Sequence, residues 1–287
     1  MDTTDTAETP FRFEHGDFDI TVFSDGYIRV PIEVIAADGT DAQRAEVMAA
    51  TGDPDGENVR SKANIPLLRR GKDLILVDIG SGDKYQPSDG KLVGHMAMAG
   101  VAPSEITKIV ITHGHPDHMW AMLDGGTGKL TFPNATYYVN EAEWRYWTDP
   151  DLPANLPEDF AEFARGAQRD FAAITDRVVL VQPGAEIITG VSVLDTAGHT
   201  PAHISLEIEG GDGLIVTGDV AVNQVASFRY PTVRFAFDTD SDLAIHNRLK
   251  LLDRAATDRT KLLGYHWSYP GIGFAERNRD AYRYAAA

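Results

Sequence analysis

The 287-residue sequence contains no cysteine. Disulfide bonds, thiol nucleophiles and thiolate metal ligands are therefore excluded, and no oxidising compartment is implied. Any metal ion that the chain binds would have to be held by histidine, aspartate or glutamate side chains.

Basic residues are scarce as well, because 26 lysines and arginines stand against 43 aspartates and glutamates, which gives a formal net charge of −17. This balance argues against a nucleic-acid partner and against an anionic membrane surface. The sequence has no apolar run of the roughly 20 residues that a membrane span needs. Its start, MDTTDTAETP, does not have the basic and apolar segments of a signal peptide. We therefore expect a cytoplasmic protein as written, although removal of a leader would leave the same sequence.

Segments typical of strands and of helices alternate along the chain. Residues 1–10 are expected to form a loose tail, and residues 11–287 a single α/β domain in which helices cover packed sheets. Apolar and β-branched runs predict strands at 18–26, 74–82, 107–112, 177–181, 191–196, 203–210, 213–219 and 261–266. Helical periodicity and capping residues predict helices at 40–52, 91–101, 140–147, 158–174 and 240–257.

Three of the nine histidines lie close together in THGHPDHMWA, which follows a predicted buried strand. His113 and His115 are two residues apart just beyond that strand, so their imidazoles can project to the same side. Pro116 is suited to begin a helix, which would put Asp117 and His118 on its first turn. Neutral imidazoles and a carboxylate that converge in this way are typical ligands of zinc and similar divalent metals.

Three further polar residues each follow the end of a predicted apolar strand. His199 lies in DTAGHTPAH, Asp219 in IVTGD and His266 in LLGYH. Open α/β sheets build their sites at strand ends, so these side chains are candidates to complete a site for two metals.

The series H-x-H-x-D-H, G-H, G-D and a strand-terminal histidine resembles the metallo-β-lactamase superfamily of hydrolases, from LILVDIGSG to GYHWSYPGIG. The resemblance implies an αββα sandwich with a dinuclear metal site between the sheets. It implies that one metal is held by His113, His115 and His199, the other by Asp117, His118 and His266, and that both are bridged by Asp219.

Two more residues are candidates for a supporting role at this site. Asp78 matches an aspartate at the end of an early strand in the family, where it would orient a metal ligand by a hydrogen bond. The alternative for Asp78 is a simple turn residue. His203 follows His199 by four residues and is expected to be structural or to support the ligands in the same way.

The implied cofactors are two divalent metal ions, in the first instance zinc, with manganese, iron or cobalt also compatible with these ligands. Two such metals can hold a bridging hydroxide at neutral pH, which would attack an ester-like bond. Asp219 and Asp117 are the candidate catalytic residues, and Asp219 would accept and return the proton.

Within the superfamily, the segments FPNATYYVNEAEW, GYHWSYPGIG and FDTDSD look similar to the branch of N-acyl homoserine lactonases and methyl parathion hydrolase. The resemblance implies hydrolysis of a lactone, with promiscuous hydrolysis of organophosphates. One alternative is a primary phosphotriesterase or aryl esterase. Another, from a different class, is a metal-binding protein without catalysis.

One position departs from this branch. A group of lactonases has a tyrosine three residues after the bridging aspartate, where it bonds the substrate carbonyl, and this chain has Val222 there. Tyr230 and Tyr269 are candidates to replace it.

Aromatic residues near the motifs are candidates to line an apolar pocket for a small-molecule ester or lactone: Trp120, Phe228, Tyr230, Trp267 and Tyr269. Core packing is the alternative for each of them taken singly. The apolar pieces within residues 27–66 are candidates to cover the site or to contact a partner subunit in a homodimer.

Overall fold

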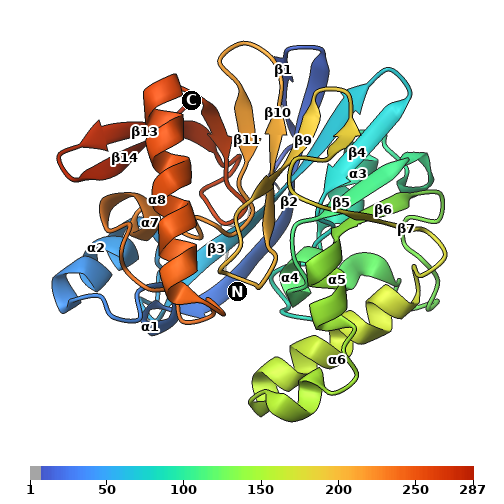
Figure 1. Cartoon of the computed structure of the whole chain (residues 1–287), viewed down its shortest axis with the longest axis horizontal. Helices are drawn as coiled ribbons and strands as arrows, with labels where there is room; N and C mark the ends of the chain where they lie inside the picture. Colours follow the sequence, from blue (N-terminus) through green and yellow to red (C-terminus); the bar gives the residue numbers. More distant parts are fainter. Residues whose placement is uncertain (1–7) are drawn as a thin grey trace.

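The computed structural model describes residues 8–287, and in this part of the chain two seven-stranded sheets pack face to face (Figure 1). Residues 1–7 of the expected tail lie outside the described residues, and residues 8–10 precede the first strand without regular structure. The first sheet has the order β1 (Phe11–His15), β2 (Phe18–Pro31), β3 (Asn58–Arg70), β4 (Asp73–Val77), β5 (Lys108–Ile111), β6 (Thr136–Asn140) and β7 (Val178–Val181). The second has the order β14 (Ala281–Ala286), β13 (Ile272–Asn278), β12 (Lys261–Leu263), β11 (Leu214–Val216), β10 (Ile204–Ile208), β9 (Val191–Asp195) and β8 (Glu186–Ile188).

Helices cover the outer faces of both sheets. Met96 of α3 (Leu92–Met98) and Phe171 of α6 (Glu158–Ala172) pack against the first sheet, and Leu252 of α8 (Ser241–Asp258) packs against the second. The α-helices among the described residues are α1 (Ile32–Ile35), α2 (Asp41–Thr51), α3 (Leu92–Met98), α4 (Pro116–Met119), α5 (Glu141–Trp147), α6 (Glu158–Ala172), α7 (Ala226–Arg229) and α8 (Ser241–Asp258). Short 3₁₀ turns lie at Pro103–Glu105, Trp120–Met122 and Leu152–Asn155.

The core between the sheets is aliphatic. Val77 and Val110 of the first sheet share a buried cluster with Leu206 and Val216 of the second. Ile109, next to Val110, lies instead in the cluster under the helices, because successive side chains of a strand point to opposite faces. Burial on both faces explains the continuous apolar run of β5. The predicted αββα sandwich is therefore confirmed.

The predicted elements are present with ends shifted by a few residues, and one shift has a clear cause. The strand predicted at 18–26 continues to Pro31, because Gly26 forms a bulge and not a turn. The pairing register with β3 slips between Ser24 and Tyr27, and Gly26 has φ 102, which few other residues adopt. No strand was predicted for β1, β3, β6, β8, β13 or β14.

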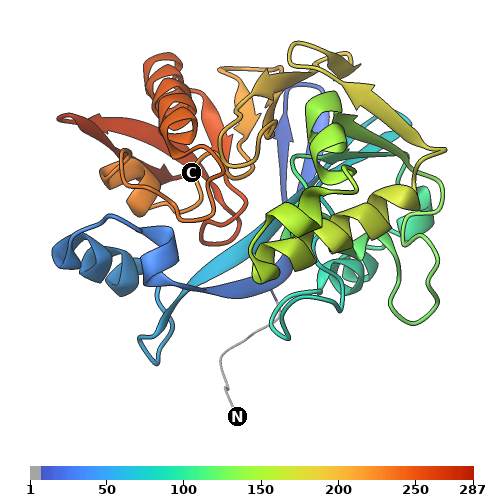
Figure 2. The ribbon, with the colours of Figure 1, turned by 60° about the horizontal axis from the view of Figure 1, so that its bottom comes forward.

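The β2–β3 pair reaches past the rest of its sheet toward α1 and α2 (Figure 2). At that end, Ile28 and Val30 pack in one cluster with Val222 and Phe235 from the loops around α7. Ile28, Val30, Ile35 and Ser61, all within residues 27–66, line the pocket at the site described below. A role of the same residues in a dimer stays a prediction. Among the described residues, no helix combines the length and the hydropathy that crossing a membrane would require.

Candidate metal centre

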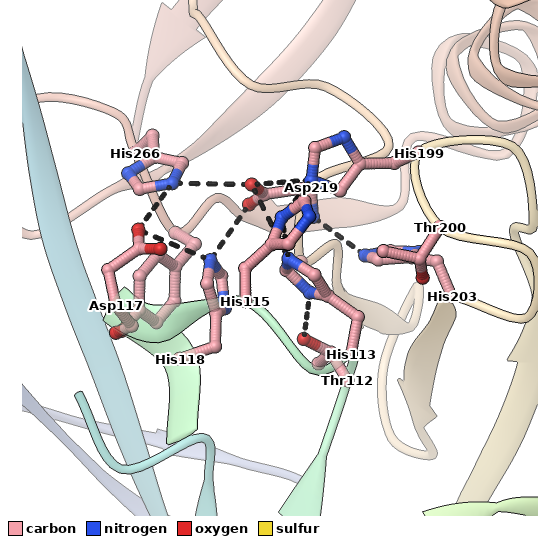
Figure 3. A network of polar contacts seen from close by, with 12 residues as sticks. Thr112, His113, His115, Asp117, His118, His199, Thr200, His203, Asp219 and His266 are labelled. Carbon is pink, nitrogen blue, oxygen red and sulfur yellow. Dashed lines mark hydrogen bonds and ion pairs between the residues drawn. The ribbon is translucent and has the colours of Figure 1, made fainter. Parts of the chain in front are cut away.

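The motifs meet at one edge of the sandwich, where β5, β9, β11 and β12 end (Figure 3). Each motif follows one of these strands, so residues from distant parts of the sequence, such as Asp117 and His266, become neighbours. None of the seven predicted ligands is more than 8% exposed: His113, His115, Asp117, His118, His199, Asp219 and His266.

Three imidazoles form a first set, called here the three-histidine group: His113, His115 and His199. Nδ1 of His115 lies 3.0 Å from Nε2 of His113 and 2.9 Å from Nε2 of His199. Burial and the neighbouring imidazoles hold the pKa of His113 and that of His115 well below the usual range. The two rings are therefore neutral at pH 7 and offer lone pairs at one point, as a divalent metal requires.

Asp117, His118 and His266 form a second set, called here the mixed group. Nε2 of His266 lies 3.3 Å from Oδ2 of Asp117, and Nε2 of His118 lies 3.6 Å from the same oxygen. Burial opposes protonation of His266, but the carboxylates of Asp219 and Asp117 outweigh it and raise the pKa of His266 to about 10. A bound cation would balance these carboxylates in place of that proton.

Asp219 lies between the two groups. Its Oδ2 is 3.4 Å from Nε2 of His199 and 3.3 Å from Nε2 of His266, and its Oδ1 is 3.4 Å from Nε2 of His118. One carboxylate thus reaches ligating atoms of both groups.

Several atoms at this centre have no hydrogen-bond partner although they are buried: Oδ2 of Asp117, Nε2 of His118 and Oδ1 of Asp219. An unsatisfied buried polar atom costs about 1–3 kcal/mol. The two carboxylate oxygens carry lone pairs. Burial opposes protonation of His118, but the neighbouring carboxylates raise its pKa, so a bound cation would take the place of the proton on its Nε2. The donor set therefore fits divalent metal ions held by nitrogen and oxygen.

The outer nitrogens of the mixed group are held by hydrogen bonds. Nδ1 of His118 lies 2.8 Å from Oδ2 of Asp78, and Nδ1 of His266 lies 2.7 Å from the backbone oxygen of Lys62. Asp78 is itself fixed, because its Oδ1 accepts from the backbone N–H of Thr112 at 2.8 Å. Donation from each Nδ1 leaves Nε2 free to face the centre.

Asp238 orients His199 by a hydrogen bond, as Asp78 orients His118, and the sequence analysis did not predict this role. Its Oδ1 lies 3.0 Å from Nδ1 of His199, and its Oδ2 pairs with the buried guanidinium of Arg248 at 3.5 Å. The acidic stretch FDTDSD indicated that an aspartate near the site was available, but the sequence does not show whether Asp238 or Asp240 orients the histidine.

His203 supports the backbone that carries Asp219. Nε2 of His203 accepts the backbone N–H of Asp219 at 2.8 Å, and its Nδ1 lies 2.8 Å from Oγ1 of Thr196. Burial lowers the pKa of His203 to about 3, so the ring stays neutral and keeps its acceptor.

A pocket opens onto this centre, and five of the seven predicted ligands form part of its wall. Among the described residues, Tyr85 and Ser61 are the other polar side chains that line it. The rest of the wall is apolar and consists of Ile28, Val30, Ile35, Phe163, Val222, Phe235 and Phe237.

Residues 60–266 match the family model of the metallo-beta-lactamase superfamily. The chain belongs to this superfamily of hydrolases. Its curated relatives include metallo-beta-lactamase domain-containing protein 1 of Xenopus laevis, which is 28% identical over 58% of each chain. N-acyl homoserine lactonase AttM of Agrobacterium fabrum is 28% identical over 50% of this chain and 52% of its own. The chain thus spans about half the length of the curated relatives that it matches.

Solved structures match over nearly the whole chain. The dizinc quorum-quenching lactonase AidC, in complex with a product, has a TM-score of 0.89 at 24% identity, with 99% of both chains covered. The hydrolase AbOPH of the beta lactamase superfamily has a TM-score of 0.88 at 27% identity, again with 99% of both covered. The superfamily fold therefore extends on both sides of the segment that the family model matches.

None of the five aromatic residues that we expected in this pocket lines it, so that prediction was wrong. Phe228 and Trp267 are fully buried and stack edge-on in the core beneath α8. Trp120 is buried next to Phe163 and faces the helices. His266 and Trp267 lie in the turn that follows β12, and Nε1 of Trp267 donates to the backbone oxygen of Ala221 at 2.7 Å, which holds its ring in the core.

The two tyrosines proposed to replace Val222 are also absent from the pocket wall. The hydroxyl of Tyr230 donates to Glu46 at 2.5 Å on the outer surface, and that of Tyr269 donates to the backbone oxygen of Val22 at 2.8 Å. Tyr85 occupies the wall instead. Tyr85 lies between two motifs in the sequence and is adjacent to neither of them. The sequence therefore did not indicate that it lines the pocket.

Proposed function

We propose that this chain is a dinuclear metal-dependent hydrolase that opens a lactone of the N-acyl homoserine lactone type. The observation that carries the proposal is the position of Asp219, whose Oδ2 lies 3.4 Å from the three-histidine group and 3.3 Å from the mixed group. When bound, two divalent ions would supply a water of lowered pKa and would polarise the substrate carbonyl. Zinc is the first candidate, with manganese, iron and cobalt as alternatives.

The residues have separate tasks in this proposal. The three-histidine group would hold one ion, the mixed group the other, and Asp219 both. Oδ2 of Asp117 and Oδ1 of Asp219 are carboxylate oxygens without a hydrogen-bond partner. We assign to Asp219 the transfer of a proton to the leaving alkoxide, because it lies between both groups.

Tyr85 is the candidate for the contact with the substrate carbonyl. It lines the same pocket as Asp117 and Asp219, where Val222 offers only an apolar side chain. Its ring is held edge-on by Trp120 and Phe163, each with centroids 5.9 Å away. Burial and the charge of Asp117 raise the pKa of Tyr85, so its hydroxyl stays protonated and can donate to a developing oxyanion.

The apolar wall supports an acyl chain as the remainder of the substrate. Seven aliphatic or phenyl side chains line the pocket, and the chain as a whole is strongly acidic, which favours a neutral ligand over an anionic one. The names of AttM and AidC as lactonases support the same substrate class.

A second candidate function is hydrolysis of an aryl phosphotriester or aryl ester. It is favoured by the phenyl rings of Phe163, Phe235 and Phe237 in the wall, which suit an aryl leaving group. A third is metal binding without catalysis.

The deciding experiment measures initial rates with a long-chain N-acyl homoserine lactone and with an aryl phosphotriester at equal concentration, using zinc-loaded protein. Chelator-treated protein serves as the control. Faster ring opening supports the lactonase proposal. Faster phosphotriester hydrolysis would assign the second function, and two bound metals with no turnover on either substrate would assign the third.

A further inference from the structure

Glu143 is a buried carboxylate beside the centre that no step above uses. It lies on α5 and is 0% exposed. Its Oε1 accepts from the backbone N–H of Gly114 at 3.0 Å and from Nε1 of Trp147 at 2.6 Å. Its Oε2 accepts from Oγ1 of Thr200 at 2.8 Å and from the backbone N–H of Ala202 at 3.1 Å. Each oxygen thus receives two donors, which uses the acceptor capacity of a carboxylate.

Three of these four donors, Gly114, Thr200 and Ala202, come from the two loops that carry the three-histidine group, and the fourth, Trp147, lies on α5 itself. Gly114 lies between His113 and His115, and Thr200 follows His199 directly. In space, Nδ1 of His115 and Nε2 of His199 are 2.9 Å apart. Glu143 therefore links by hydrogen bonds the two chain segments whose imidazoles, His115 and His199, meet at the centre.

His115 depends on this tie more than the other ligands do. Among the described residues, no hydrogen bond holds its Nε2, whereas His199 has Asp238 on its outer nitrogen. Its ring instead rests against Trp147, with centroids 5.7 Å apart and planes at 75°. That indole is fixed in turn by its hydrogen bond to Glu143.

We propose that Glu143 is a positioning residue for the three-histidine group and determines the metal affinity of that group selectively. The proposal rests on the proposed function only in that the group binds a metal. The mixed group has its own anchors, because Asp78 holds His118 and the backbone oxygen of Lys62 holds His266. Loss of the Glu143 carboxylate should therefore affect one metal and leave the other in place.

Glu143→Gln is the matched test, because the amide has the same shape but only one acceptor oxygen. Whichever way it turns, its NH₂ group faces two of the four donors, and the tie between the loops is broken on one side. We expect the affinity for the metal of the three-histidine group to fall about 10–100-fold, the range typical for partners of ligand residues. Thr200→Val, which removes one donor and keeps the shape, should give a smaller loss in the same direction.

The measurement is a titration of chelator-treated protein with Co²⁺, followed by the visible absorption of the bound ion, with a competing chelator to obtain the two affinities. Substrate is not needed. Glu141→Gln on the same helix is the control, since among the described residues the side chain of Glu141 has its polar contacts with Arg145 and Gln182, away from the metal centre. Asp78→Asn is the mirror variant, because it should affect the mixed group.

The expected result is that Glu143→Gln weakens one of two Co²⁺ equivalents and changes the absorption spectrum of that equivalent, while Glu141→Gln changes neither. Two unchanged affinities in a folded Glu143→Gln variant would overturn the proposal. Equal weakening of both equivalents would also overturn it, since that result indicates a general loss of structure. If Glu143→Gln does not fold, Thr200→Val decides by the same criteria.

The two proposals can fail separately. Binding of two equivalents without lactone turnover would contradict the proposed function and leave the assignment of Glu143 intact. A wild-type chain that binds no Co²⁺ would contradict both.

Discussion

The three-histidine group and the mixed group lie side by side, but they are held in place by different means. In the mixed group the ligands themselves are anchored: the ring of Tyr265 stacks on His118 at 3.9 Å, and the Tyr265 hydroxyl donates to the backbone oxygen of Asp117 at 2.6 Å. In the three-histidine group the anchoring of His115 passes through the loop and through the carboxylate of Glu143.

Their charges differ as well. Burial and mutual repulsion keep His113 and His115 neutral, whereas the carboxylates around His266 keep it protonated near pH 7 until a cation replaces the proton. The comparison indicates that the mixed group would attract a metal ion by its negative charge, whereas the three-histidine group would select it by the geometry of its neutral imidazoles.

The largest effect is expected for Asp219→Ala, which removes the ligand that the two groups share. Metal content should fall from two ions toward one per chain. Turnover should fall more than about 100-fold, beyond the usual loss for a supporting residue. Metal analysis and kcat on the preferred substrate check this. Unchanged turnover would contradict the assignment of the whole centre.

Tyr85→Phe should lower kcat by about 100-fold while both metals remain bound, because only the donor to the developing oxyanion is lost. Tyr230→Phe is the control, since that hydroxyl lies on the outer surface against Glu46. A lower metal content in Tyr85→Phe, or equal kcat in both variants, would show that Tyr85 has no contact with the reacting carbonyl.

The fold and the candidate ligands could be predicted from sequence because the ligands follow short, largely apolar strands, of which β5 and β11 are almost fully buried. Val110 and Val216 belong to runs that are apolar on both faces, and a polar residue at the end of such a run stands out. The β3 strand could not be recognised in the same way. Its first half interleaves Arg60 and Lys62 with small buried residues, which does not resemble a strand of the core.

The supporting residues and the pocket could not be predicted, since they depend on contacts between distant segments. Glu143 appears in sequence as an ordinary helix carboxylate, and its four donors come from three separate parts of the chain. Proximity to a motif misled the assignment of Trp267, which lies beside His266 in sequence but is fully buried in the core. The positions of Tyr85 and Phe163 follow from packing alone.

Two conservative changes should separate the halves of the centre. Asp78→Asn removes the carboxylate that orients His118, and Asp238→Asn removes the one that orients His199. Each should weaken one metal by about 10-fold or more, the mixed group in the first case and the three-histidine group in the second. Competition titrations with a chelator measure both affinities. The same metal weakened by both variants would show that the two groups do not act separately.

The smallest effect is expected in the pH dependence of stability of the metal-free protein, where two buried histidines beside Asp219, His203 and His266, should act with opposite sign. The pKa of His203 is lowered from 6.5 to about 3, so its contribution is present above pH 6.5 and is lost as the pH falls toward 3. The pKa of His266 is raised to about 10, so its contribution is present below pH 6.5 and is lost as the pH rises toward 10. Each proton changes the free energy of unfolding by at most about 1.4 kcal/mol per pH unit.

The free energy of unfolding of chelator-treated protein, measured with urea, should therefore have a maximum near pH 6.5. His203→Gln should flatten the acid side of that maximum and His266→Gln the alkaline side. A variant that flattens the opposite side would contradict the direction of the pKa shift assigned to that histidine.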